Sequence, residues 1–239
     1  MSEKPNPLES CDDLLHGEMK LCQRVDGYRY SADALLLAAF ALPLCPGARA
    51  LDLGAGSGVI ALILARRGRP ARVVAVELQA GLAGLARRNA AQNATDPRVE
   101  VVEADALTRP FTAAAFDLVI SNPPFQPAGS GPLNPDPERA TARHEIAMTL
   151  PEWLAACRAA LAPGGAICLV HPADQEKRML AHAAAVGLHL RRFQRALDRP
   201  GGRPRLLLYD FRAEPGPLEK LDDVAIEAEG GKFGIDGYR

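Results

Sequence analysis

A glycine-rich stretch, residues 51–58, joins one apolar run to a second apolar run that has helical spacing. The residues ahead of it, 48–53, predict a short buried strand, and residues 59–67 predict a helix. Glycines at alternate positions allow positive φ and let a ligand approach the backbone amides, while the N-terminus of the helix adds a partial positive charge. The chain is therefore expected to be organised around a strand–turn–helix unit with a ligand at the turn.

The glycine spacing and the residue before it indicate which ligand this is. Gly54, Gly56 and Gly58 follow the pattern Gly-x-Gly-x-Gly, which differs from the dinucleotide pattern Gly-x-Gly-x-x-Gly. Asp52 ends the strand, and its carboxylate would repel a pyrophosphate but can help to hold the ammonium and sulfonium groups of S-adenosylmethionine (SAM). A purely structural turn is the alternative. The predicted cofactor-binding residues here are Asp52, Gly54, Ala55, Gly56 and Gly58.

Two further strands end near carboxylates. Residues 72–77 are an apolar run that ends at Glu77, about twenty residues beyond the glycines, where a carboxylate can accept both ribose hydroxyls of an adenosine cofactor. Residues 81–93 predict a helix and residues 99–103 a third strand. Asp105 could then accept the adenine amino group while the Ala106 amide reads the ring. A solvent-facing glutamate and an ordinary loop aspartate are the alternatives.

The tetrapeptide Asn122-Pro123-Pro124-Phe125 follows a fourth buried strand, residues 116–121. Proline disfavours helix for the residue before it, so the chain is held extended and the carbonyl directions are stiffened. The Asn122 side-chain oxygen and the Pro123 carbonyl can then bind both hydrogens of an exocyclic amine and orient its nitrogen for attack on a methyl sulfonium. Phe125 offers a flat face for a planar group. The four residues are predicted to be catalytic; a plain Pro-Pro turn is the alternative.

Three other segments carry candidate contacts. Ser31 is a predicted N-cap of a helix over residues 34–42, and Ser31 and Asp33 are candidate cofactor contacts. Residues 126–143 form a long Pro- and Gly-containing connection, a candidate substrate loop. Residues 188–195 and 205–211 predict a closing hairpin rich in arginine. The predicted RNA-phosphate contacts are Arg139, Arg143, Arg191, Arg192, Arg195 and Arg203, with a solvated hairpin as the alternative for the last four.

Bulk properties limit the function classes. The formal net charge of −1 argues against a surface that grips nucleic acid everywhere and leaves room for a local basic patch. The five cysteines show no C-x-x-C pair, which favours free thiols in a reducing compartment and argues against a zinc site. No metal site is therefore expected. No signal peptide or membrane span is predicted, so a cytoplasmic protein is expected.

We expect one main domain over residues 23–212, after an N-terminal lead of residues 1–22 that could form a strand or short hairpin. Residues 213–239 form an acidic C-terminal tail to which the sequence assigns no function. The sequence does not define an oligomeric state.

Residues 52–58, Glu77, Asp105 and the segment 122–125 together resemble the Rossmann-like SAM-dependent methyltransferases that modify planar exocyclic amines. The resemblance covers residues 20–212. It implies a seven-stranded, mostly parallel α/β sheet with one antiparallel strand and SAM over the carboxyl ends of the strands. Residues 30–37 and 142–145 resemble more narrowly the tRNA1(Val) adenine-N6 methyltransferases, which implies an adenine next to the anticodon as the target.

Other functions share the tetrapeptide. Methyltransferases that modify guanine amines of ribosomal RNA carry it, as do protein glutamine methyltransferases. The glutamine enzymes usually have Tyr where this chain has Phe125 and carry an N-terminal helical domain, and both features disfavour that branch. A SAM-binding or RNA-binding module without turnover is the non-enzymatic alternative, against which Asn122 argues because binding alone does not need its acceptor.

Overall fold

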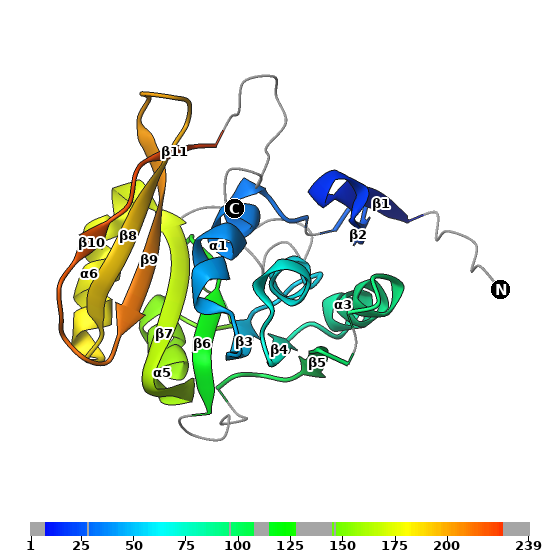
Figure 1. Ribbon diagram of the computed structural model, residues 1–239, viewed down its shortest axis with the longest axis horizontal. Coiled ribbons are helices and arrows are strands. Elements are labelled where there is room, and N and C mark those ends of the chain that lie inside the picture. Colours follow the sequence, from blue (N-terminus) through cyan, green and yellow to red (C-terminus); the bar gives the residue numbers. More distant parts are fainter. Residues whose placement is uncertain are drawn as a thin grey trace.

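A computed structural model describes residues 8–27, 29–95, 97–107, 115–127, 145 and 147–226. Its centre is a nine-stranded sheet in the order β10-β8-β9-β7-β6-β3-β4-β5, with β11 also paired to β8 (Figure 1). The larger strands are β3 (Arg49–Leu53), β4 (Arg72–Glu77), β5 (Val99–Glu103), β6 (Phe116–Ser121), β7 (Leu161–Pro172), β8 (His189–Leu197) and β9 (Pro204–Arg212). Only β9 runs antiparallel to its neighbours among these strands, so the predicted α/β class with one antiparallel strand is confirmed.

Helices cover both faces of this sheet (Figure 1). One face carries α1 (Ala32–Ala41), α2 (Val59–Ile63), which continues into a π-helical turn at Leu64–Gly68, and α3 (Ala80–Gln92). The other face carries α5 (Leu150–Ala160) and α6 (Glu176–Ala185). Neighbouring residues of one strand serve opposite cores: Ala50 packs with α1 and α2, whereas Leu51 packs with α5. Burial on both faces explains why these strands read as continuous apolar runs.

The register brings the predicted site residues to one edge of the sheet. β3 lies between β4 and β6, with Leu51 opposite both Val74 and Val119. Glu77 at the end of β4 lies opposite Glu103 at the end of β5. Because parallel strands end at the same edge, the glycine turn, Glu77, Asp105 and Asn122 converge there.

The described part of the N-terminal lead forms an antiparallel hairpin of β1 (Glu9–Leu14) and β2 (Met19–Arg24), which lies beside α3. Cys11 lies opposite Cys22 in its register, and the two form a disulfide. The expectation that all five cysteines are free is therefore wrong for this pair, because strand pairing places together two residues that the chain separates by eleven. Cys45, Cys157 and Cys168 are free and buried.

The C-terminal segment extends the sheet beyond Arg212. β10 (Glu219–Lys220) and β11 (Val224–Ala225) pair in parallel with β8 and line its outer edge (Figure 1). Arg191 donates to the carbonyls of Glu214, Pro215 and Pro217, and Arg195 forms an ion pair with Asp223. We call residues 213–226 the C-terminal strap. In the part of the chain that the structure describes, no helix is long and apolar enough to cross a membrane.

Candidate active site

A cavity opens at the carboxyl ends of β3, β4, β5 and β6. Of the predicted cofactor-binding residues, Gly54, Gly56, Glu77, Asp105, Ala106 and Asn122 line it. Apolar side chains complete the wall, among them Leu78, Leu82, Met148 and Trp153. Carboxylates beside flat and aliphatic surfaces suit a ligand that combines hydroxyl groups with a planar ring.

The glycine turn has the backbone that its sequence predicts. Gly54, Gly56 and Gly58 have φ of 74°, 57° and 86°. A Cβ on Gly54 would lie 2.9 Å from Cζ2 of Trp153 in α5, which lines the same cavity. The turn therefore needs glycine at Gly54 both for its conformation and for the approach of the indole ring.

Glu77 holds the turn and faces the cavity at the same time. Its Oε2 accepts the Gly56 amide at 2.8 Å and its Oε1 accepts the Gln79 amide at 2.9 Å. Only 6% of Glu77 is exposed. Each carboxylate oxygen has a second lone pair, so Glu77 can accept ligand hydroxyls while these amide bonds fix its position.

Asp52 lies behind the turn, outside the residues that line the cavity. It is fully buried, and its Oδ2 accepts the Ala61 amide of α2 at 3.0 Å. Burial raises the pKa of the Asp52 carboxyl to about 7, and the nearby Glu77 contributes, whereas the Ala61 amide opposes the shift. Asp52 therefore does not reach the cavity. It anchors α2 to β3 through the Ala61 amide. Ala55 and Gly58, also predicted as cofactor contacts, lie off the cavity wall too.

Asn122 follows β6 at the boundary of the cavity. Its Nδ2 donates to Oδ2 of Asp33 at 3.1 Å, and its Oδ1 is buried without a hydrogen-bond partner among the described residues. An orphaned buried acceptor is costly to the fold unless a ligand satisfies it. Ser121, just before it, donates to the Leu53 carbonyl and accepts the Trp153 indole N–H at 2.8 Å, which ties β3, β6 and α5 together beneath Asn122.

A second cavity is lined by Asp33, the hydrogen-bond partner of Asn122. Ser31, Asp33, Phe125, Asp174, Arg205 and Ile226 are among its lining residues. Ser31 and Asp33, predicted as cofactor contacts, thus line this cavity and not the one beside Glu77. Ser31 is at the N-cap position of α1 without a side-chain cap, because its hydroxyl donates to Asp33 instead.

Phe125 packs against a buried histidine. The Phe125 and His171 rings meet edge-on with centroids 5.3 Å apart, and His171 is fully buried at the end of β7. Burial lowers the pKa of His171 to about 4, and Arg178 adds to this shift. His171 is therefore neutral near pH 7 and supports Phe125.

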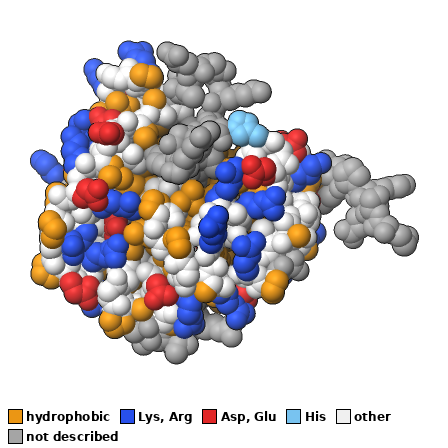
Figure 2. Space-filling view, viewed as in Figure 1, with side chains coloured by type: hydrophobic (Ala, Val, Ile, Leu, Met, Phe, Trp, Pro, Cys, Tyr) orange, Lys and Arg blue, Asp and Glu red, His pale blue; other side chains and the backbone are white. Residues whose placement is uncertain are grey.

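The predicted RNA-binding arginines separate into two groups. Arg191 and Arg195 bind the C-terminal strap, while Arg192 stacks on Phe40 at 4.2 Å and lies 3.6 Å from Asp210. Of the four predicted hairpin arginines, only Arg203 has an exposed side chain that makes no such contact with the described part of the chain. Arg139 and Arg143 lie outside the described residues. On the face shown in Figure 2, basic and acidic side chains are interspersed.

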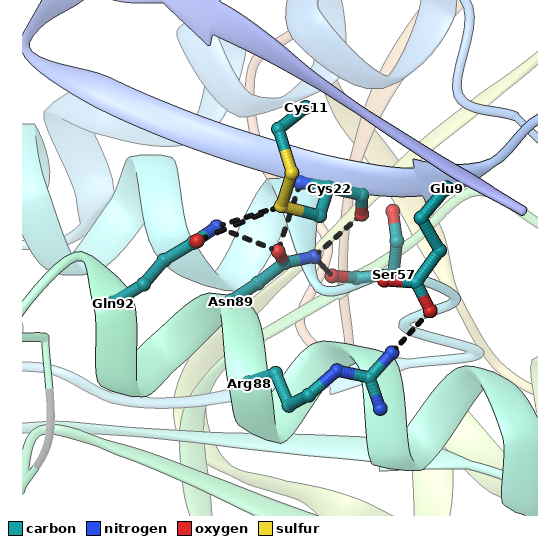
Figure 3. Close-up of polar contacts among 7 residues, drawn as sticks. All are labelled: Glu9, Cys11, Cys22, Ser57, Arg88, Asn89 and Gln92. Atoms are coloured by element: carbon teal, nitrogen blue, oxygen red, sulfur yellow. Dashed lines mark hydrogen bonds and ion pairs between the residues drawn. A yellow bond between two sulfur atoms is a disulfide. The ribbon is translucent and has the colours of Figure 1, made fainter. Parts of the chain in front are cut away.

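A buried amide connects the N-terminal hairpin to the glycine turn (Figure 3). Asn89 of α3 accepts the Cys22 amide at 2.9 Å and donates to the Cys22 carbonyl at 3.0 Å and to the Ser57 carbonyl at 2.9 Å. Asn89 is fully buried. The hairpin and its disulfide are thereby bonded through one side chain to the loop that lines the cavity.

Several site residues carried no local signal in the sequence. Trp153 and Met148 come from α5 and the segment before it, far along the chain from the glycine turn, and only the packing of α5 on β3 and β6 brings them there. Trp153 is the one tryptophan of the chain, but this alone does not indicate that it lines a ligand cavity. Asn89 is one polar residue of an ordinary amphipathic helix.

The first cavity fits SAM by the chemistry of its donors and acceptors. Glu77 and Asp105 supply acceptors for hydroxyl and amino groups, the glycine turn exposes backbone beside them, and Leu78, Leu82 and Trp153 supply apolar surface. No group of three or more His, Cys, Asp or Glu residues suited to a metal ion occurs among the residues that the structure describes.

The chain matches a family model described as the methyltransferase small domain over residues 30–186. A tRNA1(Val) (adenine(37)-N6)-methyltransferase of Aeromonas hydrophila is 40% identical over 204 residues, which cover 84% of this chain and 84% of the relative. A protein of the same name from Bacteroides thetaiotaomicron is 34% identical over 77% of this chain and 76% of the relative.

Solved structures share the fold at low identity. The tRNA m1G37 methyltransferase of M. jannaschii superposes with a TM-score of 0.64 at 13% identity, over 89% of this chain and 59% of that one. A ribosomal protein L11 methylase from Lactobacillus delbrueckii gives a TM-score of 0.56 at 16% identity, over 76% of this chain and 79% of that one.

Proposed function

The chain belongs to the methyltransferase small domain family and, within it, to the tRNA1(Val) (adenine(37)-N6)-methyltransferases, and from this premise we propose its reaction. The enzyme transfers a methyl group from SAM to the N6 amine of adenine 37 in a tRNA1(Val). SAM, when bound, supplies an electrophilic methyl group on a sulfonium. The new N–CH₃ bond forms as the S–CH₃ bond breaks, S-adenosylhomocysteine leaves, and the amine loses one proton.

The observation that carries this proposal is Oδ1 of Asn122, which is buried and has no hydrogen-bond partner among the described residues. Asn122 lines the first cavity, and Asp33, which accepts its Nδ2, lines the second. An amine conjugated to a purine ring is a weak nucleophile, and an acceptor fixed in place can orient it and stabilise the developing positive charge. Phe125, on the second cavity, offers a face on which an extruded base can stack. The chain thus needs no side-chain base at the amine, because the proton becomes acidic as the new bond forms.

The RNA contacts are proposed for the tip of the β8–β9 hairpin. Arg199, Arg203 and Arg205 are exposed there, and their side chains make no ion pair with described residues. Arg205 lines the second cavity, so phosphates held at the tip would lie beside the base that enters it. The two predicted arginines of the connection before α5, Arg139 and Arg143, remain candidates. A tRNA substrate also supports the cytoplasm as the place of action.

The guanine-amine and glutamine alternatives are distinguished by product. Purified enzyme with methyl-labelled SAM is incubated with total RNA and, separately, with a protein extract, and the products are digested to nucleosides or amino acids. The proposal predicts label in N6-methyladenosine from the tRNA fraction. Label in N2-methylguanosine or in methylglutamine would replace the substrate assignment while keeping the methyltransferase.

A further inference from the structure

The side-chain amide of Asn122 has two orientations that differ little in shape. Rotation by half a turn exchanges its oxygen for its nitrogen, and only the hydrogen-bond partners decide between them. The Oδ2 of Asp33 receives Nδ2 of Asn122 at 3.1 Å. An ionised carboxylate can only accept, so the reverse orientation would set two oxygens against each other. Asp33 therefore selects the orientation that leaves Oδ1 of Asn122 on the other side.

Asp33 is itself held in place. It lies in the first turn of α1 with only 8% of its surface exposed. The Ser31 hydroxyl donates to its Oδ1, and the Ser31 carbonyl accepts the Ala34 amide at 3.2 Å, which closes the turn. Both carboxylate oxygens of Asp33 thus have assigned partners, one on its own turn and one on Asn122 across 89 residues of chain.

The location of these residues separates this role from cofactor binding. Ser31 and Asp33 line the second cavity together with Phe125, whereas the residues beside Glu77 line the first. The hydrogen bond between Asn122 and Asp33 links the two regions. Asp33 touches the Asn122 amide from the second cavity, so it can alter the methyl-transfer step without touching SAM.

We propose that Asp33 is a positioning residue: it fixes the Asn122 amide so that Oδ1 points at the acceptor amine, and Ser31 fixes Asp33. The inference rests on the proposed function and adds to it the source of the orientation of Asn122. Removing Asp33 leaves the amide free to present a donor to the amine, which repels the N–H groups that must be bound. The loss falls on the methyl-transfer step.

Two substitutions of Asp33 should lower the methylation rate to different extents. Asp33→Leu is similar in size and offers Asn122 no acceptor, whereas Asp33→Asn can still accept through its own oxygen in one of its two orientations. We expect a fall of about a hundredfold in the single-turnover methylation rate for Asp33→Leu, the scale for one preorganised polar group, and a smaller fall for Asp33→Asn. Ser31→Ala, which loosens Asp33 only, should cost less than either.

SAM affinity by calorimetry, tRNA affinity and thermal unfolding are measured for the same variants. SAM dissociation constants should stay within about twofold of the original, since Asp33 lies off the first cavity. A loss of SAM affinity as large as the loss of rate would overturn the proposal and make Asp33 a cofactor contact. Asp33→Asn carries this test if Asp33→Leu does not fold.

A double-mutant cycle separates positioning from a merely structural role. In an Asn122→Ala background, the residue that Asp33 positions is gone, so Asp33→Asn should change the rate no further. An equal fold-loss in both backgrounds would overturn the proposal. The unsubstituted enzyme tests the proposed function separately: if it labels guanine or glutamine, the substrate assignment fails. The coupling between Asp33 and Asn122 is still measured by the cycle, with whichever substrate the enzyme methylates.

Discussion

The Nδ2 of Asn122 donates to Oδ2 of Asp33 at 3.1 Å, although the two residues are 89 positions apart in the chain. This bond joins the walls of two cavities: Asn122 lines one with the glycine turn and Glu77, and Asp33 lines the other with Phe125 and Ser31. It leaves Oδ1 of Asn122 buried and without a partner among the described residues. The site is thereby prepared for a ligand that brings an N–H group to that oxygen.

Glu77→Ala should weaken SAM binding. Each hydrogen bond to a charged acceptor contributes about 1.5–3 kcal/mol, so at least a tenfold higher dissociation constant is expected in calorimetry. Glu103→Ala is the matched control, because Glu103 lies opposite Glu77 in the register but outside the cavity lining. Equal SAM affinity in Glu77→Ala and the original chain, with the fold intact, would remove Glu77 from the site.

Gly54→Ala and Gly164→Ala separate the two reasons why Gly54 must be glycine, its positive φ and the close approach of Trp153. Both residues have φ of 74°, but a Cβ on Gly54 would meet Trp153 whereas one on Gly164 meets nothing within 4 Å. Both should lose about 1–2 kcal/mol of unfolding free energy to the backbone strain. Gly54→Ala should lose more and also bind SAM less tightly, measured by denaturant titration and calorimetry. Matching losses in the two variants would show that the Trp153 contact has no weight.

The order of the larger elements could be predicted because each buried strand of a parallel sheet is a continuous apolar run. The strands at 72–77, 99–103 and 116–121 have the predicted bounds. Helix α6 was not predicted, and the strap could not be, since β10 and β11 have two residues each and join β8 through backbone bonds that nearly any sequence can make.

In the site, the grouping of Glu77, Asp105 and Asn122 along one cavity could be predicted, because parallel topology alone brings strand ends to one edge. The sequence could not place Asp33 with respect to the two cavities, since that depends on how α1 packs against β7 and β9 of the sheet. It also could not pair Cys11 with Cys22 or assign Arg191 and Arg195 to the strap, because strand register and the course of the strap set both.

Arg203→Ala should weaken tRNA binding and flatten its salt dependence. Loss of one phosphate contact lowers the log–log slope by about 0.7–0.9. Arg191→Ala is the comparison, because its guanidinium already binds the strap carbonyls; it should leave the slope unchanged and lower the melting temperature. A normal slope in Arg203→Ala together with a reduced slope in Arg191→Ala would reverse this assignment.

His171 should make the protein less stable in mild acid. The folded pKa is lowered from 6.5 to about 4, so between these values the unfolded chain binds more protons than the folded one. The free energy of unfolding carries no penalty from His171 above about pH 6.5. As the pH falls towards 4, the free energy of unfolding decreases by at most about 1.4 kcal/mol per pH unit because of this residue. His171→Phe keeps a ring against Phe125 and should show a shallower fall in unfolding free energy. Parallel curves for the two proteins would contradict a buried neutral His171.

The most direct test of the account is single-turnover methylation of a defined, unmodified tRNA1(Val) transcript by the original enzyme and by Asn122→Ala. A transcript with guanine in place of adenine 37 serves as the matched control. We predict one N6-methyladenosine per tRNA, no label in the guanine transcript, and a rate about a hundredfold lower for Asn122→Ala at unchanged SAM affinity. Label in the guanine transcript, or an Asn122→Ala rate equal to the original, would contradict the claim that Asn122 presents an adenine amine to SAM.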